Sequence, residues 1–376
     1  MEYAIATVII PIYFLEKGIS LPLTTLISGI VMMPWMVKFI FGGVVDFFIR
    51  LGRKFFIITG GILGAIGFFI LAFIDPGIAL IPFAFLLFIG HCGIAFIDVS
   101  ADALAIQISK EEERGKINAS MFSGLFIGMA FGTSFIALIA ENIGYTIAIF
   151  IVGIIILITL VFPLIIKEEK IVKKHQKITP MLITEFKKRN TQLLSLFMFI
   201  AALSFGLLAF AIPLYMKTVL DFNIAQIGLI TTIIPVTTVI GSITGGITTD
   251  RWGRKINLYF FMGTNMILAA MLVFTNTWQK LAIIYGIIGF LHGGHYSASG
   301  AVMMDVTNPK IGATQYSLLA SFANAGEFGI GMFSGSMIAV LGFSRVFLYS
   351  GWFYGPALLV LYFIKLKKIK KNSLYT

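Results

Sequence analysis

Apolar residues occur in long runs along most of the chain, and short polar segments separate these runs. Such runs predict helices that cross the hydrocarbon core of a bilayer, which is roughly 30 Å thick. Twelve of them cover residues 1–15, 23–45, 55–74, 78–106, 118–140, 145–166, 193–216, 224–248, 256–275, 278–304, 314–340 and 343–364. The pattern therefore predicts an all-α membrane protein with twelve transmembrane helices.

The first run is shorter than the others. Fifteen residues rise only about 22 Å as a helix, which is less than the thickness of the core. When Pro11 is matched with Pro213 in the seventh run, Met1 falls opposite Leu203, well inside that run. We expect the first helix to be truncated at its N-terminal end, and the alternative is a helix anchored unusually high in the membrane.

The longest polar stretch, residues 167–192, leaves six runs on either side of it. Basic residues are frequent in this stretch and apolar residues are few. It predicts a cytoplasmic linker with at most one surface helix. The expected domains are an N-terminal six-helix bundle over residues 1–166 and a C-terminal six-helix bundle over residues 193–376, which ends in a basic cytoplasmic tail.

Two short motifs recur in the same order in both halves. Residues 10–13 read Ile-Pro-Ile-Tyr and residues 212–215 read Ile-Pro-Leu-Tyr. The pattern Arg-x-Gly-Arg-Lys occupies residues 50–54 and again residues 251–255, each time after paired glycines and an aspartate, Asp46 or Asp250. Ordered motifs about 200 residues apart indicate a duplicated unit, which is typical of secondary transporters.

Composition and charge agree with a membrane location. The chain is 58% hydrophobic and 12% charged, with a mean hydropathy of +0.97, more apolar surface than a soluble domain could bury. All but five of the 28 Lys and Arg residues lie in alternate inter-helix segments or the C-terminal tail, the five being Lys17, Lys38, Lys217, Lys280 and Arg345. The positive-inside rule places these basic segments and the C-terminus in the cytoplasm of a multi-pass protein of the cytoplasmic membrane. Topology thus explains the net charge of +11 without a nucleic-acid partner.

Other kinds of chemistry have no support in the sequence. The single cysteine, Cys92, excludes an intrachain disulfide. The histidines and the cysteine lack zinc-site spacing, and a Gly-rich phosphate loop is absent, so we expect no metal, no cofactor and no use of ATP. A set of nucleophile and base is also missing, so an enzyme is not expected.

The repeated loops resemble the signature of the major facilitator superfamily. Residues 246–255 read Gly-x-x-x-Asp-Arg-x-Gly-Arg-Lys, whereas the first copy has a longer spacing between Asp46 and Gly52. This longer loop, with short patches at residues 33–39, 98–103, 113–115 and 313–319, is similar to the branch that holds muropeptide permeases and acetyl-coenzyme A transporters. The resemblance implies two bundles that rock about a central cavity lined by helices 1, 4, 7 and 10. It does not fix the substrate.

Ionisable side chains inside the predicted helices are candidates for solute binding or proton coupling, because a charge at mid-bilayer costs about 2.5–3.5 kcal/mol. His91, Asp98 and Asp102 share one face of the fourth helix, and His292 and His295 lie one turn apart on the tenth. His91 and His292 are separated by nearly the repeat offset, so we expect them to face each other across the cavity. Each could carry a proton or bind an anionic group, or merely form a hydrogen bond to a neighbouring helix.

Two charges near the cytoplasmic interface are expected to pair. Lys38 and Asp98 lie at equal depth with opposite sign, which predicts an ion pair between helices 2 and 4. Asp102, one turn closer to the cytoplasm, is expected to pair with Arg50 or Arg53 as a structural latch. For Asp98, both roles, a structural latch and a proton site, remain open as alternatives.

Glu327 lies at the centre of the eleventh helix, which carries no basic residue at that depth. It needs a partner from another helix or a proton, so we regard it as a candidate for proton coupling or substrate contact. Four tyrosines are further candidates for the cavity: Tyr3, Tyr13, Tyr215 and Tyr296.

The fixed spacing within the two basic loops suggests a second role. Asp46 and Asp250 stand next to arginines, where charge-assisted hydrogen bonds can clamp neighbouring helices. The expected network of gating or structural charges is Lys38, Asp46, Arg50, Arg53, Asp102, Arg114, Asp250, Arg251 and Arg254. Orientation by positive charge alone would explain the Arg and Lys residues but not the glycines and aspartates.

These features together predict a monomeric secondary transporter for a small organic solute, coupled to protons. The absence of a Gly-Pro pair in residues 124–132, which drug–proton antiporters of the superfamily usually carry, weakens an efflux function. Two alternatives stay open. One is an exporter of drugs or metabolites, and the other is a membrane receptor that keeps the fold but does not transport.

Overall fold

The computed structural model of the chain describes residues 1–108, 114–168, 178–308 and 311–366. Within these residues, the side chains of 106–108, 114–123, 178 and 312–313 are not described. The described part of the chain is helical and contains no strand.

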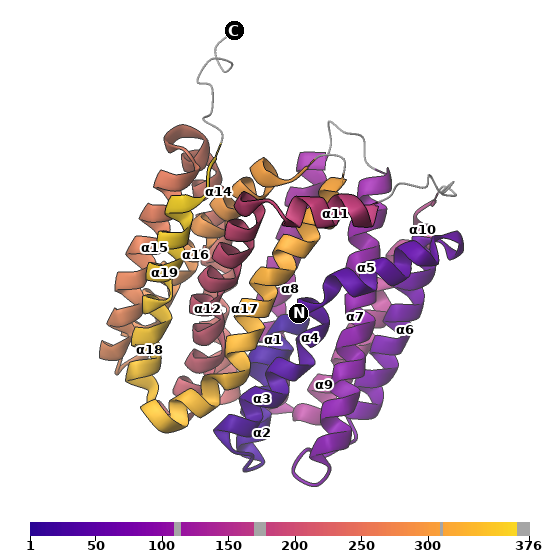
Figure 1. Cartoon of the computed structure of the whole chain (residues 1–376). Helices are drawn as coiled ribbons and strands as arrows, with labels where there is room; N and C mark the ends of the chain where they lie inside the picture. Colours follow the sequence, from indigo (N-terminus) through magenta and orange to yellow (C-terminus); the bar gives the residue numbers. More distant parts are fainter. Residues whose placement is uncertain (109–113, 169–177, 309–310, 367–376) are drawn as a thin grey trace.

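The first part of the chain begins with a short rod made of α1 (Glu2–Ala4), a π-helical turn η1 (Ile5–Ile9) and α2 (Ile10–Glu16) (Figure 1). A helix in three pieces follows, α3 (Leu21–Val31), α4 (Met33–Met36) and α5 (Lys38–Phe47). The remaining elements of this part are η2 (Ile49–Leu51), α6 (Arg53–Leu71), α7 (Leu80–Ile108), α8 (Arg114–Asn142), α9 (Tyr145–Thr159) and α10 (Val161–Ile165).

The polar stretch in the middle of the sequence contains one described helix, α11 (Ile178–Phe186), which crosses the end of the molecule at the top of Figure 1. The second part of the chain comprises α12 (Arg189–Thr218), α13 (Ile224–Thr231), α14 (Ile233–Trp252), α15 (Arg254–Met271), η4 (Leu272–Phe274), α16 (Trp278–Val306), α17 (Gly312–Leu341), α18 (Phe343–Trp352) and α19 (Tyr354–Phe363). The chain leaves α19 at the end of the molecule where α11 lies.

Eight segments of the described chain are long and apolar enough to cross a membrane. The other four predicted spans correspond to the rod α1–α2, the interrupted helix α3–α5, and helices α16 and α17. Helices α16 and α17 have 29 and 30 residues, which is enough length, but they carry more polar residues, among them His292 and Glu327. These four segments supply Tyr3, Lys38, His292 and Glu327 to the interior, and the strongly apolar helix α7 supplies Asp98 and Asp102 as well.

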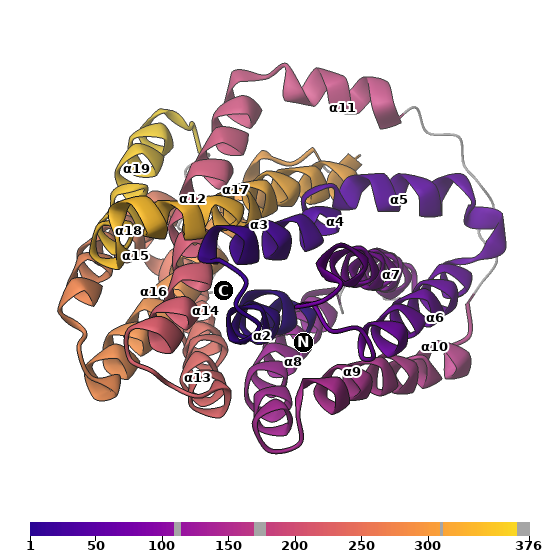
Figure 2. The same ribbon diagram turned by 90° about the horizontal axis from the view of Figure 1, so that it is seen from below.

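The helices before α11 lie on one side of the molecule, and the helices after it lie on the other (Figure 2). Two close contacts join the sides. Helix α3 packs on α17, where a Cβ atom added to Gly335 would lie 2.2 Å from the carbonyl oxygen of Leu21. Helix α8 packs on α13, where a Cβ on Gly228 would lie 2.2 Å from the carbonyl oxygen of Thr133. Glycine at these two positions lets the backbones approach closely.

The second predicted span is broken rather than continuous. Pro34 lacks the N–H that would continue the hydrogen-bond ladder, and the helix is interrupted at Met32 and Val37 on either side of it. The carbonyl group of Trp35, at this break, accepts a hydrogen bond from the Asn324 side chain at 3.0 Å. Figure 1 shows α5 tilted away from the direction of α3. A proline kink thus places Lys38 at the start of a differently oriented helix.

Candidate functional site

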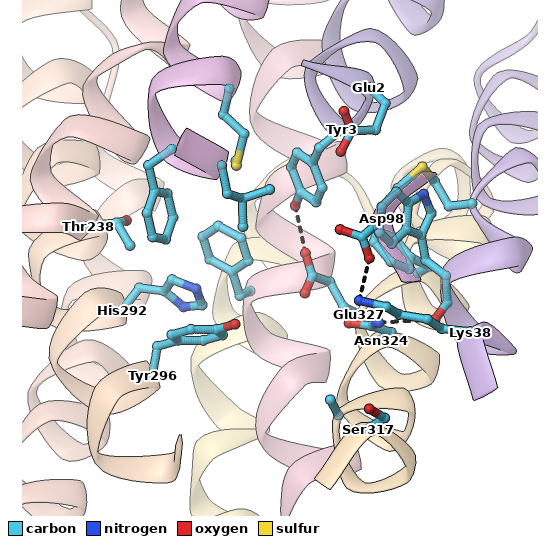
Figure 3. A pocket seen from close by; sticks show the side chains of 18 of the residues that line it. Glu2, Tyr3, Lys38, Asp98, Thr238, His292, Tyr296, Ser317, Asn324 and Glu327 are labelled. Atoms are coloured by element: carbon cyan, nitrogen blue, oxygen red, sulfur yellow. Dashed lines mark hydrogen bonds and ion pairs between the residues drawn. The ribbon is translucent and has the colours of Figure 1, made fainter. Parts of the chain in front are cut away.

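A cavity of about 320 Å³ lies between the two sides of the molecule (Figure 3). The first side lines it with Glu2, Tyr3, Met32, Trp35, Lys38, Asp98, Asp102, Leu125, Phe126 and Met129, and the second with Phe205, Ile234, Thr238, His292, Tyr296, Tyr316, Ser317, Ala320, Asn324, Glu327 and Phe328. Helices 1, 4, 7 and 10, which the resemblance implied, all contribute through α1, α7, α12 and α16. Helices 2, 5, 8 and 11 contribute as well.

Two of the lining residues occupy equivalent positions in the two sequence repeats. Tyr3 on α1 and Phe205 on α12 are 202 residues apart, the same offset as Pro11 and Pro213, and both line the cavity. Equivalent positions of the two repeats therefore form opposite walls. Binding sites of secondary transporters commonly lie at such an interface between repeats.

The expected ion pair between Lys38 and Asp98 is present. The Lys38 ammonium also lies 3.1 Å from Asp102 Oδ2 and 5.8 Å from the centre of the Trp35 ring. The expectation that Asp102 pairs with Arg50 or Arg53 is wrong. Asp98 and Asp102 are one helical turn apart on α7, so a single long lysine side chain reaches both, whereas the Arg53 guanidinium donates to the carbonyl group of Ala103.

Glu327 has the partner from another helix that its isolation on α17 required. The Tyr3 hydroxyl donates to Glu327 Oε1 at 2.7 Å, and Figure 3 shows this hydrogen bond crossing the cavity. The aromatic ring of Tyr3 packs against Phe328, with 6.0 Å between the ring centres. One hydroxyl group thus links the first helix of one side to the eleventh helix of the other.

His292 and Tyr296 also face the cavity, as expected. The imidazole of His292 stacks on Phe205 with 3.7 Å between ring centres, and its Nδ1 has no hydrogen-bond partner among the described residues. The Tyr296 side chain is 42% exposed although it lies deep within the molecule, because it borders the cavity. Helix α16 therefore supplies one imidazole and one phenol to the site.

His91 does not face His292 across the cavity, so that prediction is wrong. Its side chain is fully buried, its Nδ1–H donates to the Leu87 carbonyl group at 2.9 Å, and it packs near the Phe68 ring of α6. The two histidines are 201 residues apart while the repeat offset is 202. A difference of one residue turns a side chain by about 100° around a helix.

Three further candidates also lie outside the cavity. His295 is buried and its ring faces Tyr354 of α19. Tyr13 stacks on Tyr145 with 4.1 Å between ring centres, and the Tyr215 hydroxyl donates to the carbonyl group of Thr275. Tyr13 and Tyr215 each lie ten residues beyond the cavity residues Tyr3 and Phe205, which is about 15 Å along a helix.

Several lining residues were not among the predicted site residues, notably Glu2, Trp35, Thr238, Tyr316, Ser317 and Asn324. Glu2 is an ionisable group within a predicted span, so the same search for intramembrane charges would have found it. Trp35 follows the proline that breaks the second span. Neutral residues such as Thr238 and Ser317 carry no such signal in the sequence.

The charged loops form contacts that differ between the two halves. In the second half, Arg254 bonds Asp250 at 3.2 Å and Asp305 at 3.1 Å, which joins α14, α15 and α16. In the first half, Glu168 accepts hydrogen bonds from the backbone N–H groups of Arg53 and Lys54 at 2.6 and 3.1 Å. Both Asp305 and Glu168 were missed by the sequence interpretation.

Three other members of the predicted charge network lie at the surface of the molecule. Asp46, Arg50 and Arg251 are exposed, and Arg53 interacts electrostatically with Asp46. The side chain of Arg114 lies outside the described residues. Within the described part of the chain, no group of three His, Cys, Asp or Glu side chains could hold a metal ion.

Comparison with known proteins agrees with this architecture. The model of the Major Facilitator Superfamily matches residues 1–198 and, separately, residues 194–374. The Putative transporter AmpG 4 of Rickettsia conorii is 23% identical over 382 residues, covering 95% of this chain and 91% of the relative. The Putative transporter AmpG 4 of Rickettsia felis is 23% identical over 289 residues, covering 72% of this chain and 69% of the relative.

The two matched ranges together cover nearly the whole chain, and both relatives agree with the branch that the short sequence patches resemble. The apolar helices identify a multi-pass membrane protein, and the match extends over nearly the whole chain. This chain belongs to the Major Facilitator Superfamily of membrane transporters.

Proposed function

We propose that the protein is a proton-coupled secondary transporter that moves a small organic solute across the cytoplasmic membrane by alternating access. In this proposal, twelve membrane-crossing units form an N-terminal bundle (residues 1–166) and a C-terminal bundle (residues 193–376). Residues 167–192 link them on the cytoplasmic side, where the C-terminus also lies. The observation that carries the proposal is the cavity between the two sides, lined by Lys38, Asp98, His292 and Glu327.

The contacts between the two sides support a state in which the cavity is closed at the end of the molecule opposite the basic loops. At the end of the molecule opposite α11, Lys217 pairs with Glu16 at 2.6 Å. Near the same end, the hydroxyl groups of Thr133 and Thr232 share a hydrogen bond of 2.7 Å, and the backbone N–H of Gly335 donates to Thr25 Oγ1 at 3.0 Å. Alternating access requires these contacts to separate when the cavity opens to the exterior.

Proton coupling is supported by the carboxyl groups of the cavity. Asp98 is bound to a single cation that it shares with Asp102, and Glu327 receives a hydrogen bond from an uncharged hydroxyl. A carboxyl group in such surroundings can take up a proton when the cavity faces one side and release it when the cavity faces the other.

Reconstitution into proteoliposomes tests this function. A panel of sugars, peptides, amines and carboxylates is added outside the vesicles, and a fluorescent pH indicator in the lumen reports proton movement. For the solute that is transported, Asp98→Asn is expected to abolish accumulation driven by a pH gradient and to leave counterflow exchange intact. Loss of both activities in a folded variant would contradict coupling at Asp98.

The same experiment separates the alternatives. A receptor that keeps the fold would bind a solute without accumulation or counterflow. An exporter would load inside-out vesicles preferentially. If no solute of the panel moves, in either orientation of the gradient, the proposed transport function is wrong.

A further inference from the structure

The charges that line the cavity do not balance. Four lining residues carry carboxylates, Glu2, Asp98, Asp102 and Glu327, whereas Lys38 carries the one ammonium group among the lining side chains. The N-terminal ammonium of Met1 lies 3.3 Å from Glu2 Oε2 and pairs with it, which leaves two more carboxylates than ammonium groups. The Lys38 ammonium is already engaged by both Asp98 and Asp102. With all carboxyl groups ionised, the cavity is therefore negative, and such a cavity attracts cationic solutes and repels anionic ones.

Glu327 is the carboxylate best placed to meet a solute. Its Oε1 accepts a hydrogen bond from Tyr3 at 2.7 Å, and no hydrogen bond to its Oε2 is described. No basic side chain of the described residues lies within ion-pair distance of it. Figure 3 shows its carboxyl group projecting between Tyr3 and Lys38 into the cavity. A carboxylate in the interior of a membrane protein requires a cationic partner or a proton.

Aromatic side chains form part of the wall of the cavity that contains Glu327. Tyr3, Trp35, Phe205, Tyr296 and Phe328 all line the cavity. The faces of aromatic rings attract ammonium groups, and they also cover the apolar body of a solute. An inorganic cation would need several oxygen ligands, which the described residues do not gather at one point.

On the basis of the proposed transport function, we propose that the solute is a small organic cation whose ammonium group binds Glu327 and whose apolar or aromatic part packs against Phe205, Tyr296 and Phe328. The cavity volume of about 320 Å³ lies at the lower end of the range for ligand pockets, which favours a compact amine. The lining contains no arginine, and this argues against carboxylate or phosphate solutes.

Three probes of nearly equal shape test the charge preference. Tyramine is a cation, tyrosol replaces its ammonium with a hydroxyl, and 4-hydroxyphenylacetate is an anion. Titration calorimetry on the purified full chain is expected to give tyramine an affinity at least about tenfold higher than that of tyrosol, the difference typical of a charge-assisted hydrogen bond. The anion is expected to bind more weakly than both.

Substitutions assign the preference to one carboxyl group. Glu327→Gln keeps the shape and an acceptor for Tyr3, so it is expected to bind tyramine and tyrosol equally. Glu141→Gln removes an exposed carboxylate outside the cavity and is expected to keep the preference. Tyr3→Phe leaves the Glu327 charge in place and is expected to keep the preference too. If Glu327→Gln does not fold, the comparison of the three probes on the wild-type chain still tests the inference.

Specific results would overturn the inference. The first is that the wild-type chain binds tyrosol or 4-hydroxyphenylacetate more tightly than tyramine. The second is that neither tyramine nor any other amine of the transport panel binds. The third is that Glu327→Gln still prefers tyramine as the wild type does. If vesicles accumulate a neutral or anionic solute, the inference fails while the transport function stands. If no solute moves, the transport function fails first.

Discussion

The close packing of α8 on α13 provides the sharpest test of alternating access. Gly228 of α13 faces α8 at the end of the molecule away from α11. A Cβ atom at this position would lie 2.2 Å from the Thr133 carbonyl oxygen and 2.4 Å from Ala137 Cβ. We therefore expect Gly228→Val to prevent closure of this end and to favour the state that opens to the exterior.

The size of the effect follows from the geometry. Non-bonded carbon atoms are at their best separation near 3.5–4.0 Å, so the two helices would have to move apart by about 1–1.5 Å. Overpacking of this kind costs about 1–3 kcal/mol. If that cost falls on the closed state alone, the ratio of open to closed molecules rises by roughly fivefold to 150-fold.

Spin labels at Ile143 and Val219, two exposed positions at this end on opposite sides of the interface, measure the population by pulsed electron resonance. The distance between the labels is shorter in the closed state than in the open state, and we expect the population at the longer distance to rise in Gly228→Val. Gly263→Val provides a matched control, because a Cβ at Gly263 meets nothing within 4 Å. An unchanged distance distribution in a folded Gly228→Val protein would refute the assignment of this contact as an external gate.

Two further predictions concern charges. Lys38→Ala leaves Asp98 and Asp102 without their shared cation, so we expect a loss of about 1–3 kcal/mol in the free energy of unfolding. Thermal unfolding in detergent measures this loss as a lower Tm. A Tm equal to that of the wild type would contradict a role of these three residues as a structural latch. Outside the membrane, the hydrogen bond from Lys17, with a second from the Gly77 N–H, lowers the pKa of Asp75 below its ordinary value of 3.8. Because the pKa of Asp75 is lower in the folded state, this carboxylate stabilises the fold above pH 3.8, and the stabilisation is lost as the pH falls through the folded-state pKa. Asp75→Asn lacks this carboxylate, so its Tm is expected to drop less below pH 4 than the Tm of the wild type. An equal drop in both proteins would exclude this pair as a source of acid sensitivity.

The sequence alone predicted which segments enter the membrane, eight of which are long and apolar enough in the structure, and it determined where charges lie along them. Helical rise converts residue number into depth, so equal depth and opposite charge were enough to predict that Lys38 pairs with Asp98, and the ion pair is present. The same arithmetic identified Glu327 as a buried carboxylate that needed a partner from another helix. The repeat was visible as well, because duplicated motifs survive in the linear order of residues.

Only the tertiary structure decided which direction each side chain faces. His91 turns toward Phe68 while His292 turns into the cavity, because one residue of register rotates a side chain by about 100°. The partner of Glu327 is Tyr3, and 324 residues separate the two in the chain. Depth is a property of a single helix and can be read from its sequence. Orientation depends on how helices pack against one another, and that information resides in contacts between distant segments.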